Sequence, residues 1–305
     1  TDDPADGHEC DQGATTDEVA TTPVTGVASD LDLTSFDGTQ IRMHWFPLDG
    51  AGPDDPAPTV LMGPGWSLSG DTSLGDDPAP FGLLSIKDLH DEGYSVLTWD
   101  PRGFGKSGGQ AEVDAPDVEG RDVQTMIDWV AEQPQAMLDA TGDPRVGMVG
   151  GSYGGGIQLT TAAIDCRVDA IVPNMAWHSL ETSLFQNETV KEGWASILTD
   201  IGGAHVDPHI GSAYESGITT GTLSADDKAW FIARGPGDLV DQITTPTLLI
   251  QGTVDTLFPL ETQDAALLFL RAAQRTQPDF HFDDEAAFTR IYQAVSGMPW
   301  GLARP

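Results

Sequence analysis

The sequence predicts an α/β fold: a mostly parallel sheet with helices on both faces. Short apolar segments alternate with segments of helical periodicity along most of the chain, and several apolar segments end in turns rich in Gly, Pro and Asp. Strands separated by helices favour a parallel sheet, because a crossover helix returns the chain to the edge where the next strand begins. At 305 residues, the chain is long enough for one large domain with an inserted subdomain.

The elements follow from their periodicity. Residues 41–48 alternate between apolar and polar side chains, as a half-buried strand does, and four apolar residues spaced as on a helix lie within 117–132. That helical stripe consists of Val123, Met126, Ile127 and Val130. The expected strands are 41–48, 58–62, 94–99, 145–150, 168–173 and 247–250, and the expected helices are 81–90, 117–132 and 155–164.

One segment interrupts the alternation. Residues 176–243 contain several Gly and the tryptophans Trp177, Trp194 and Trp230, but no clear strand. We interpret 176–243 as a helical cap inserted between two strands of the sheet. The predicted organisation is a polar N-terminal arm (1–27), a core (28–175 and 244–305) and the cap.

The charge balance restricts the partners. The chain has 48 acidic and 14 basic residues, a formal net charge of −34. A surface this acidic repels nucleic-acid phosphates and anionic membranes, so nucleic-acid binding is excluded. No apolar run approaches the ~20 residues that span a bilayer. The polar N-terminus has no signal-peptide features, and we expect a mature secreted or extracytoplasmic protein; adaptation to salt and a merely soluble surface remain alternative explanations of the acidity.

The two cysteines, Cys10 and Cys166, are far apart in sequence, and neither belongs to a Cys-x-x-Cys pair. A zinc site is therefore not expected. In a secreted chain the two would form one disulfide, although two separate thiols remain the alternative. No cluster of His, Cys and carboxylates has the spacing of metal ligands, and we expect no metal and no organic cofactor.

The strongest motif lies at residues 150–154, which read Gly-Gly-Ser-Tyr-Gly. This matches the nucleophile elbow G-x-S-x-G, in which a serine sits on a strained turn between a strand and a helix. The pattern alone is common in a Gly-rich chain, but here a predicted strand precedes it and a predicted helix follows it. The motif therefore predicts that Ser152 is a catalytic nucleophile.

Two further parts of a serine-hydrolase site follow from position. An oxyanion hole needs two backbone N–H groups, and we expect them from Tyr153, directly after the serine, and from Trp66 in the glycine-rich segment 63–67. Asp255 follows the predicted strand 247–250 and is the candidate acid that orients a catalytic histidine. A helix cap is the alternative role for Asp255.

Together these segments resemble a known family. Residues 99–108 (Trp-Asp-Pro-Arg-Gly-Phe-Gly-Lys-Ser-Gly), 150–155, 191–194 and 251–258, with Ile-Val-Pro at 171–173 followed by Trp177, are similar to the X-Pro dipeptidyl-peptidase and cocaine-esterase-like branch of the α/β-hydrolases. The resemblance covers roughly residues 27–274. It implies an α/β-hydrolase fold with a helical cap and a Ser–His–Asp hydrolase that acts on an ester or an amide, with Ser152 as nucleophile and Asp255 as acid.

The histidine is harder to assign. The order of the residues in this fold is serine, acid, histidine, and His281 alone follows Asp255. Family members usually place a Gly-Gly-His or similar motif there, whereas residues 280–282 read Phe-His-Phe, and the C-terminal jelly-roll domain of larger members has no counterpart. His281 is the candidate base; His178, out of order, is the alternative, and the third possibility is that no catalytic histidine exists.

Residues 103–108 also match the dinucleotide-binding pattern G-x-G-x-x-G, but no amphipathic helix follows to hold a pyrophosphate, so we reject that interpretation. The sequence favours a serine hydrolase that cleaves small-molecule or polymeric carboxylic esters through an acyl-enzyme on Ser152. The alternatives are a vestigial, binding-only hydrolase fold and an X-Pro peptidase, for which no anchor of the substrate amine is identifiable. The oligomeric state cannot be predicted.

Overall fold

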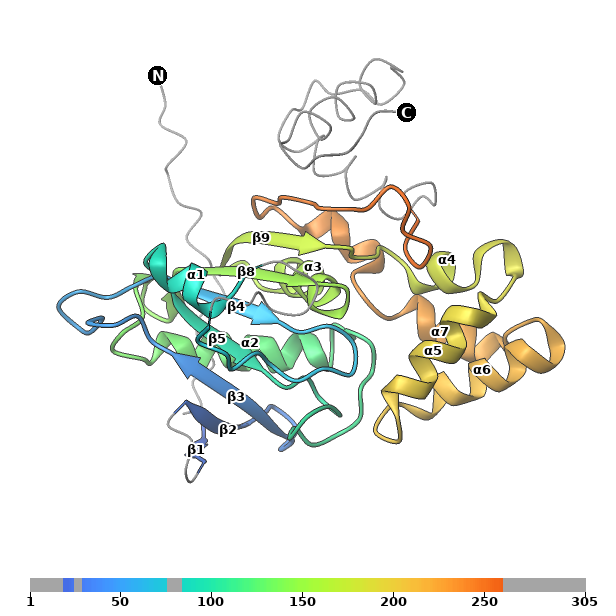
Figure 1. The fold of residues 1–305 in the computed structure, drawn as a ribbon, viewed down its shortest axis with the longest axis horizontal. Helices are drawn as coiled ribbons and strands as arrows, with labels where there is room; N and C mark the ends of the chain where they lie inside the picture. The colour runs from blue at the N-terminus through green and yellow to red at the C-terminus, as the bar shows by residue number, and fades with distance from the viewer. Residues whose placement is uncertain (1–18, 25–28, 76–83, 260–305) are drawn as a thin grey trace, which may run out of the picture.

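The computed structural model describes residues 19–24, 29–75 and 84–259, and these build a seven-stranded sheet of order β1-β2-β3-β5-β4-β8-β9 (Figure 1). Its parallel part consists of β5 (Ser95–Trp99), β4 (Thr59–Gly63), β8 (Val146–Gly151) and β9 (Val168–Asn174). An antiparallel edge is added by β1 (Thr21–Pro23), β2 (Asp30–Thr34) and β3 (Gln40–Phe46). The sheet is thus mixed, and its parallel half contains the predicted strands that flank the serine.

The predicted strand 247–250 lies beside β9 and runs parallel to it. Thr247 is paired with Ile171, and Ile250 is paired with Asn174. The N–H of Leu248 donates to the Ile171 carbonyl at 3.0 Å. The segment after Ile250 therefore leaves the sheet at the carboxyl edge, where β8 also ends, and ligands of open α/β sheets bind at this edge.

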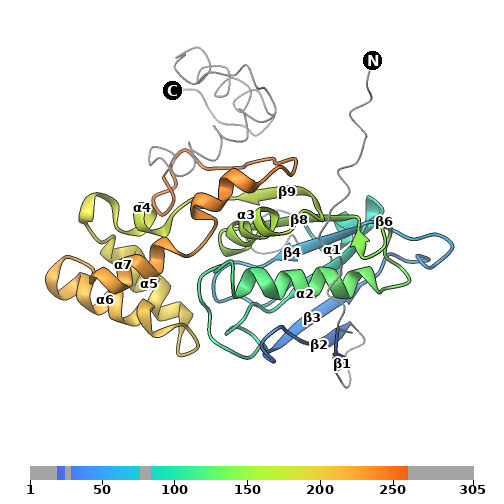
Figure 2. The same ribbon diagram turned by 180° about the vertical axis from the view of Figure 1, so that it is seen from behind.

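Helices cover both faces of the sheet (Figures 1 and 2). On one face lie α2 (Glu119–Ala131) and α3 (Tyr153–Ile164), and on the other lies α1 (Ile86–Asp91). Because successive side chains of a strand point to opposite faces, Leu61 packs in the cluster under α2 and α3, whereas its neighbours Val60 and Met62 pack with α1.

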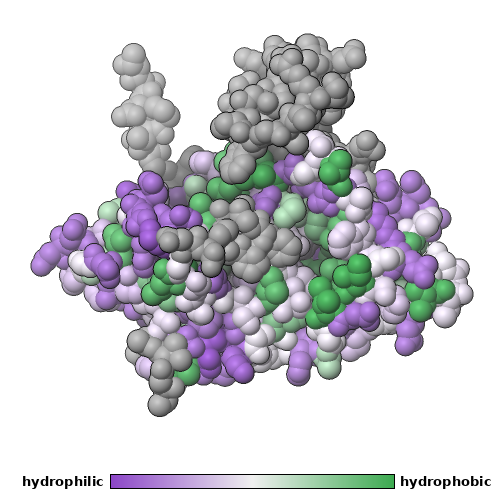
Figure 3. Space-filling model, in the orientation of Figure 1, coloured by the Kyte–Doolittle hydropathy of each residue, from purple (hydrophilic) through white to green (hydrophobic). Residues whose placement is uncertain are grey.

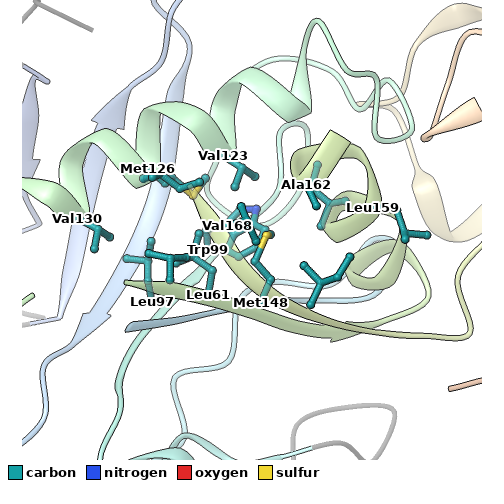
Figure 4. Packing of buried hydrophobic residues seen from close by; sticks show 14 of the residues in the cluster. Leu61, Leu97, Trp99, Val123, Met126, Val130, Met148, Leu159, Ala162 and Val168 are labelled. Atoms are coloured by element: carbon teal, nitrogen blue, oxygen red, sulfur yellow. The ribbon is translucent and has the colours of Figure 1, made fainter. Parts of the chain in front are cut away.

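The larger of the two layers is densely apolar. In Figure 4 the α2 residues Val123, Met126 and Val130 lie over Leu61 and Leu97 of the sheet, and all five are buried. These α2 residues belong to the stripe that predicts the helix, so the pattern identified both the element and its buried face. At ~25 cal/mol per Å² of apolar area, burial of such side chains is the main force that stabilises the layer.

Between β9 and residues 247–250 the chain is helical. It forms α4 (Leu180–Leu184), η1 (Gln186–Glu188), α5 (Glu192–Gly202), α6 (Pro208–Thr220), α7 (Ala225–Ile232) and η2 (Gly237–Gln242). Helices α4 to α7 gather beside the carboxyl edge of the sheet (Figure 1). From here on we use the name cap for residues 176–236, a shorter segment than the predicted 176–243. In contrast, η2 packs on α3, and Val240 and Ile243 are buried in the main core.

The short, mostly polar elements were not predicted. These are β1, β2 and the hairpin of β6 (Leu138–Ala140) and β7 (Asp143–Pro144). None of them carries a long apolar pattern, because each is short and only partly buried. On the surface, hydrophobic residues gather over α5 in the view of Figure 3, where Ile197 and Ile201 are about half exposed. Among the described residues, no helix is long and apolar enough to cross a bilayer.

Candidate active site

Ser152 occupies a strained turn between β8 and α3. Its φ of 57° and ψ of −117° lie in a region that side-chain-bearing residues rarely adopt. The Ser152 N–H donates to the Asn174 carbonyl at 2.8 Å, and the Ser152 carbonyl accepts from the N–H groups of Gly155 and Gly156. Neighbouring backbone thus fixes the strained geometry on both sides, as a conformation that costs about 1–3 kcal/mol requires.

The glycines of the motif are required by the close approach of β4. A Cβ at Gly150 would lie 2.6 Å from the Gly63 carbonyl oxygen, and a Cβ at Gly154 would overlap that same oxygen. The pattern G-x-S-x-G therefore has a packing cause in this chain: the end of β4 lies against the turn on both sides of the serine.

The two residues predicted to supply the oxyanion donors are in contact through their side chains. The side chains of Trp66 and Tyr153 are in edge-to-face contact, with ring centroids 5.1 Å apart, and Phe104 packs against both. The Trp66 indole N–H donates to the Leu198 carbonyl of α5 at 2.9 Å. Within the described residues, neither backbone N–H donates a hydrogen bond to another protein group.

Asp255 caps its own loop at the same edge of the sheet. One carboxylate oxygen accepts the N–H groups of Leu257 and Phe258 at 2.8 and 2.9 Å, and the other accepts the side-chain amide of Gln251 at 3.0 Å. These bonds lie within residues 251–258, and the helix cap that is the alternative role for Asp255 falls outside the described residues. Yet the loop also reaches the site, because Leu257 and Phe258 line the cavity onto which Ser152 opens.

The cap holds this loop in place. The Lys191 ammonium group donates to the carbonyls of Thr256 and Leu257, at 3.0 Å each, and the Trp194 indole donates to the Thr256 hydroxyl at 3.1 Å. In the sequence, residues 191–194 stand out only as part of the family resemblance. The structure shows what these residues do locally: they fix residues 256–257 against the start of α5.

An apolar cavity lies between the elbow and the cap. It holds about 920 Å³ of space not occupied by atoms, including the part open to solvent. Its floor contains Trp66, Ser152 and Tyr153. Its walls come mainly from the cap and include Leu180, Leu184, Phe185, Leu198, Ile210 and Phe231. Among the described residues, Glu181 is the one carboxylate in this lining, and it forms an ion pair of 2.8 Å with Lys228.

Behind the elbow lies a buried acidic pair that sequence analysis missed. The pKa of Glu119 is raised to about 8. Burial is the main cause, the charge of the nearby Asp122 adds to the rise, and hydrogen bonds from backbone N–H groups oppose it. Burial, together with Glu119, also raises the pKa of Asp114 well above its usual range. Burial thus disfavours the charged form of both carboxyl groups. The sequence signal is weak: acidic residues among small apolar ones in 111–119.

Several predicted residues lie beyond the described chain. His281 and Cys10 are outside the described residues, so the identity of the base and the pairing of Cys10 with Cys166 stay predictions; Cys166 itself is disulfide-bonded. His178 follows β9 but is not among the residues that line the cavity at Ser152. Among the described residues, no group of three His, Cys, Asp or Glu side chains is arranged to hold a metal.

The sheet, the elbow at the end of a central parallel strand and the inserted helices define an α/β-hydrolase. Residues 37–206, more than half of the chain, match the model of the X-Pro dipeptidyl-peptidase family, S15. The chain therefore belongs to this family of hydrolases. The match includes β3 to β9, the elbow and the start of the cap, and it confirms the resemblance seen in the sequence.

Curated relatives match part of the chain. A polyketide transferase from a Penicillium species is 28% identical over 146 residues, which are 47% of this chain and 43% of that protein. An uncharacterized 31.7 kDa protein from Escherichia coli is 27% identical over 165 residues, 53% of this chain and 55% of that protein. The chain thus spans about half the length of the curated relatives it matches.

Solved structures share the fold at low identity. The α/β-hydrolase GrgF from Penicillium has a TM-score of 0.53 at 19% identity, covering 80% of this chain and 85% of its own. Acetyl xylan esterase 1 from Thermoanaerobacterium has a TM-score of 0.53 at 17% identity, covering 91% of this chain and 86% of its own. These likenesses confirm the α/β-hydrolase fold.

Proposed function

We propose that this chain is a serine hydrolase that cleaves carboxylic esters through an acyl-enzyme on Ser152. The observation that carries the proposal is the geometry of the elbow: a strained serine at the N-terminus of α3 opens onto an apolar cavity. Within the part of the chain that the structure describes, the backbone N–H groups of Tyr153 and Trp66 have no protein acceptor. An oxyanion formed on attack by Ser152 would be stabilised by these donors and by the positive end of the α3 dipole.

The chemistry requires a base and an acid. We assign the acid to Asp255 and the base to His281, which would accept the serine proton during acylation and activate water during deacylation. The Asp255 loop supports this assignment because it lies at the carboxyl edge of the sheet and contributes to the cavity wall. The vestigial alternative differs in one respect, the absence of a functional base.

The composition of the cavity favours an ester over an X-Pro peptide. An X-Pro peptidase must bind the positively charged amine of its substrate, and Glu181, the carboxylate of the cavity lining, is already paired with Lys228. The remaining wall is mostly hydrophobic and suits an uncharged acyl chain.

A second candidate is acyl transfer to an acceptor other than water. The apolar wall favours it, because a cavity that excludes water protects an acyl-enzyme from hydrolysis. Curated relatives described as polyketide transferases, from Penicillium and from Gibberella fujikuroi, support the same idea.

The decisive experiment combines labelling with turnover. The full chain is treated with a fluorophosphonate, and the modified residue is located by mass spectrometry; we expect Ser152. Turnover is then measured on p-nitrophenyl esters of increasing chain length, on an X-Pro anilide and on polycaprolactone as a polymeric ester, with and without an added alcohol. Ester cleavage supports the proposal, alcohol ester as the main product supports transfer, and EDTA should have no effect. Failure to label Ser152 and to cleave any ester would favour the vestigial alternative.

A further inference from the structure

The hydroxyl of Tyr153 is tied to a buried carboxyl group. Tyr153 is 3% exposed, and its hydroxyl donates to the Glu119 side chain at 3.3 Å. Its ring contacts Trp66, which supplies the other predicted oxyanion donor. The two residues that supply the predicted donors are thus linked through their rings, and Glu119 accepts a hydrogen bond from the hydroxyl of Tyr153.

Glu119 in turn holds a loop. One of its oxygens accepts the Glu112 N–H at 2.5 Å, and the other accepts the Ala115 N–H at 3.0 Å. The loop needs such support, because Val113 and Asp114 both adopt a positive φ, 61° and 56°. A single buried carboxyl group therefore fixes a strained loop on one side and Tyr153 on the other.

The same loop is attached to the cap. The Ala111 N–H donates to the His205 carbonyl at 2.9 Å, and the Asp207 N–H donates to the Ala111 carbonyl at 3.0 Å. The Arg234 guanidinium is paired with Glu112 at 2.6 Å. A continuous set of hydrogen bonds thus runs from the cap through residues 111–115 to Glu119 and Tyr153.

We infer that Glu119 is a positioning residue for ester cleavage. It anchors Tyr153, and therefore the oxyanion donor predicted beside Ser152, to the loop of residues 111–115, which is hydrogen-bonded to the cap. This inference rests on the proposed function. Its physical basis is that the ring and the N–H of Tyr153 share one Cα, so fixing the ring at both ends restricts the orientation of the N–H. Donors must be held in place before the oxyanion forms if they are to stabilise it without reorganisation.

The test compares three variants of the full chain on p-nitrophenyl butyrate. Tyr153→Phe removes the hydroxyl alone, and Glu119→Gln keeps the size of the side chain but loses one acceptor. Removing an oxyanion donor costs about 10²–10³-fold in kcat, and misaligning one costs less, so we expect kcat to fall about 10-fold with KM unchanged. The double variant should lose no more than about 10-fold, because both changes break the same link.

The matched control is Asp128→Asn. Asp128 is also a buried carboxylate on α2, paired with Arg167 at 2.6 Å, and it lies nine residues along this helix from Glu119. It should reduce thermal stability while kcat stays within about 2-fold of wild type, as expected for a change that removes no transition-state contact.

Three outcomes would overturn the inference. If Tyr153→Phe and Glu119→Gln have the same kcat as the control, the hydrogen bond between Tyr153 and Glu119 does not position the Tyr153 N–H. A raised KM with unchanged kcat would show a binding role instead. A wild-type chain without turnover would overturn the proposed function and the inference together, whereas active wild type with unaffected variants would overturn the inference alone.

Discussion

The helix that begins at the serine and the helix that lines the cavity differ in how they are packed. In α3, every residue from Tyr153 to Ala163 is buried, whereas in α5 only Gly202 is buried. Close packing fixes side chains and backbone together, so α3 tolerates almost no change in volume. The half-exposed α5 has more freedom. On the proposed function, we infer that the sheet layer carries the chemistry and that the cap selects the substrate.

The largest effect expected in the sheet layer comes from the serine itself. Ser152→Ala should abolish ester turnover, with a loss of about 10⁶-fold, because no acyl-enzyme can form. Turnover of p-nitrophenyl esters measures the loss, and circular dichroism checks that the variant is folded. Wild-type turnover in the variant would remove Ser152 from the mechanism.

A single methyl group should distinguish the two regions. Gly154→Ala places a Cβ on the Gly63 carbonyl oxygen, and Gly211→Ala, on α6 of the cap, meets no atom within 4 Å. We expect Gly154→Ala to lose about 1–3 kcal/mol of stability and, by displacing the elbow, about 10²-fold in activity. Gly211→Ala should gain about 0.5–1 kcal/mol, because alanine suits a helix interior better than glycine. Urea unfolding and ester turnover measure both, and equal effects at the two sites would contradict the comparison.

The cap should alter selectivity rather than chemistry. Leu198 lines the cavity, whereas its neighbour Ile197 is 51% exposed. Leu198→Trp should lower kcat/KM for p-nitrophenyl octanoate about 10-fold relative to the acetate, since each methylene excluded from the cavity costs ~0.8 kcal/mol. Ile197→Trp, its control, should leave the ratio unchanged. A uniform loss on both esters would show that the cap contributes to chemistry after all.

The smallest effect concerns the dependence of stability on pH. Burial lowers the pKa of His44, but hydrogen bonds to Asp100 and Asp30 outweigh it, and the net pKa is raised above 6.5. The folded state therefore binds the proton more tightly than the unfolded state. The resulting stabilisation is complete below about pH 6.5 and is lost as the pH rises through the folded-state pKa. His44→Gln should flatten the curve of unfolding free energy against pH in that range. An unchanged slope in this variant would show that His44 is not responsible.

Local patterns in the sequence determined the fold class, most strands and helices of the sheet layer, and the position of the elbow. They succeeded because residues 150–154 and the stripe of α2 are constrained by neighbours close in sequence, through strand and helix periodicity. Residues 176–243 were expected to form a helical cap because they lack a strand pattern, and the helices α4 to α7 and η2 lie within this segment. Its inner lining could not be predicted, because the apolar face of α5 is broad: Leu198 lines the cavity, whereas Ile197 and Ile201 on the same face are about half exposed. Periodicity does not tell which part of such a face meets the cavity.

The tertiary structure alone decided the links between distant residues. Three such links depend on how the strands are ordered in the sheet. Gly63 lies against Gly150 and Gly154, the Lys191 side chain holds the loop at Thr256, and Glu119 reaches Tyr153. Such pairs are separated by dozens of residues and obey no local rule. A sequence motif identifies the residue types that a reaction needs. The distant side chains that hold those residues in place are determined by tertiary packing.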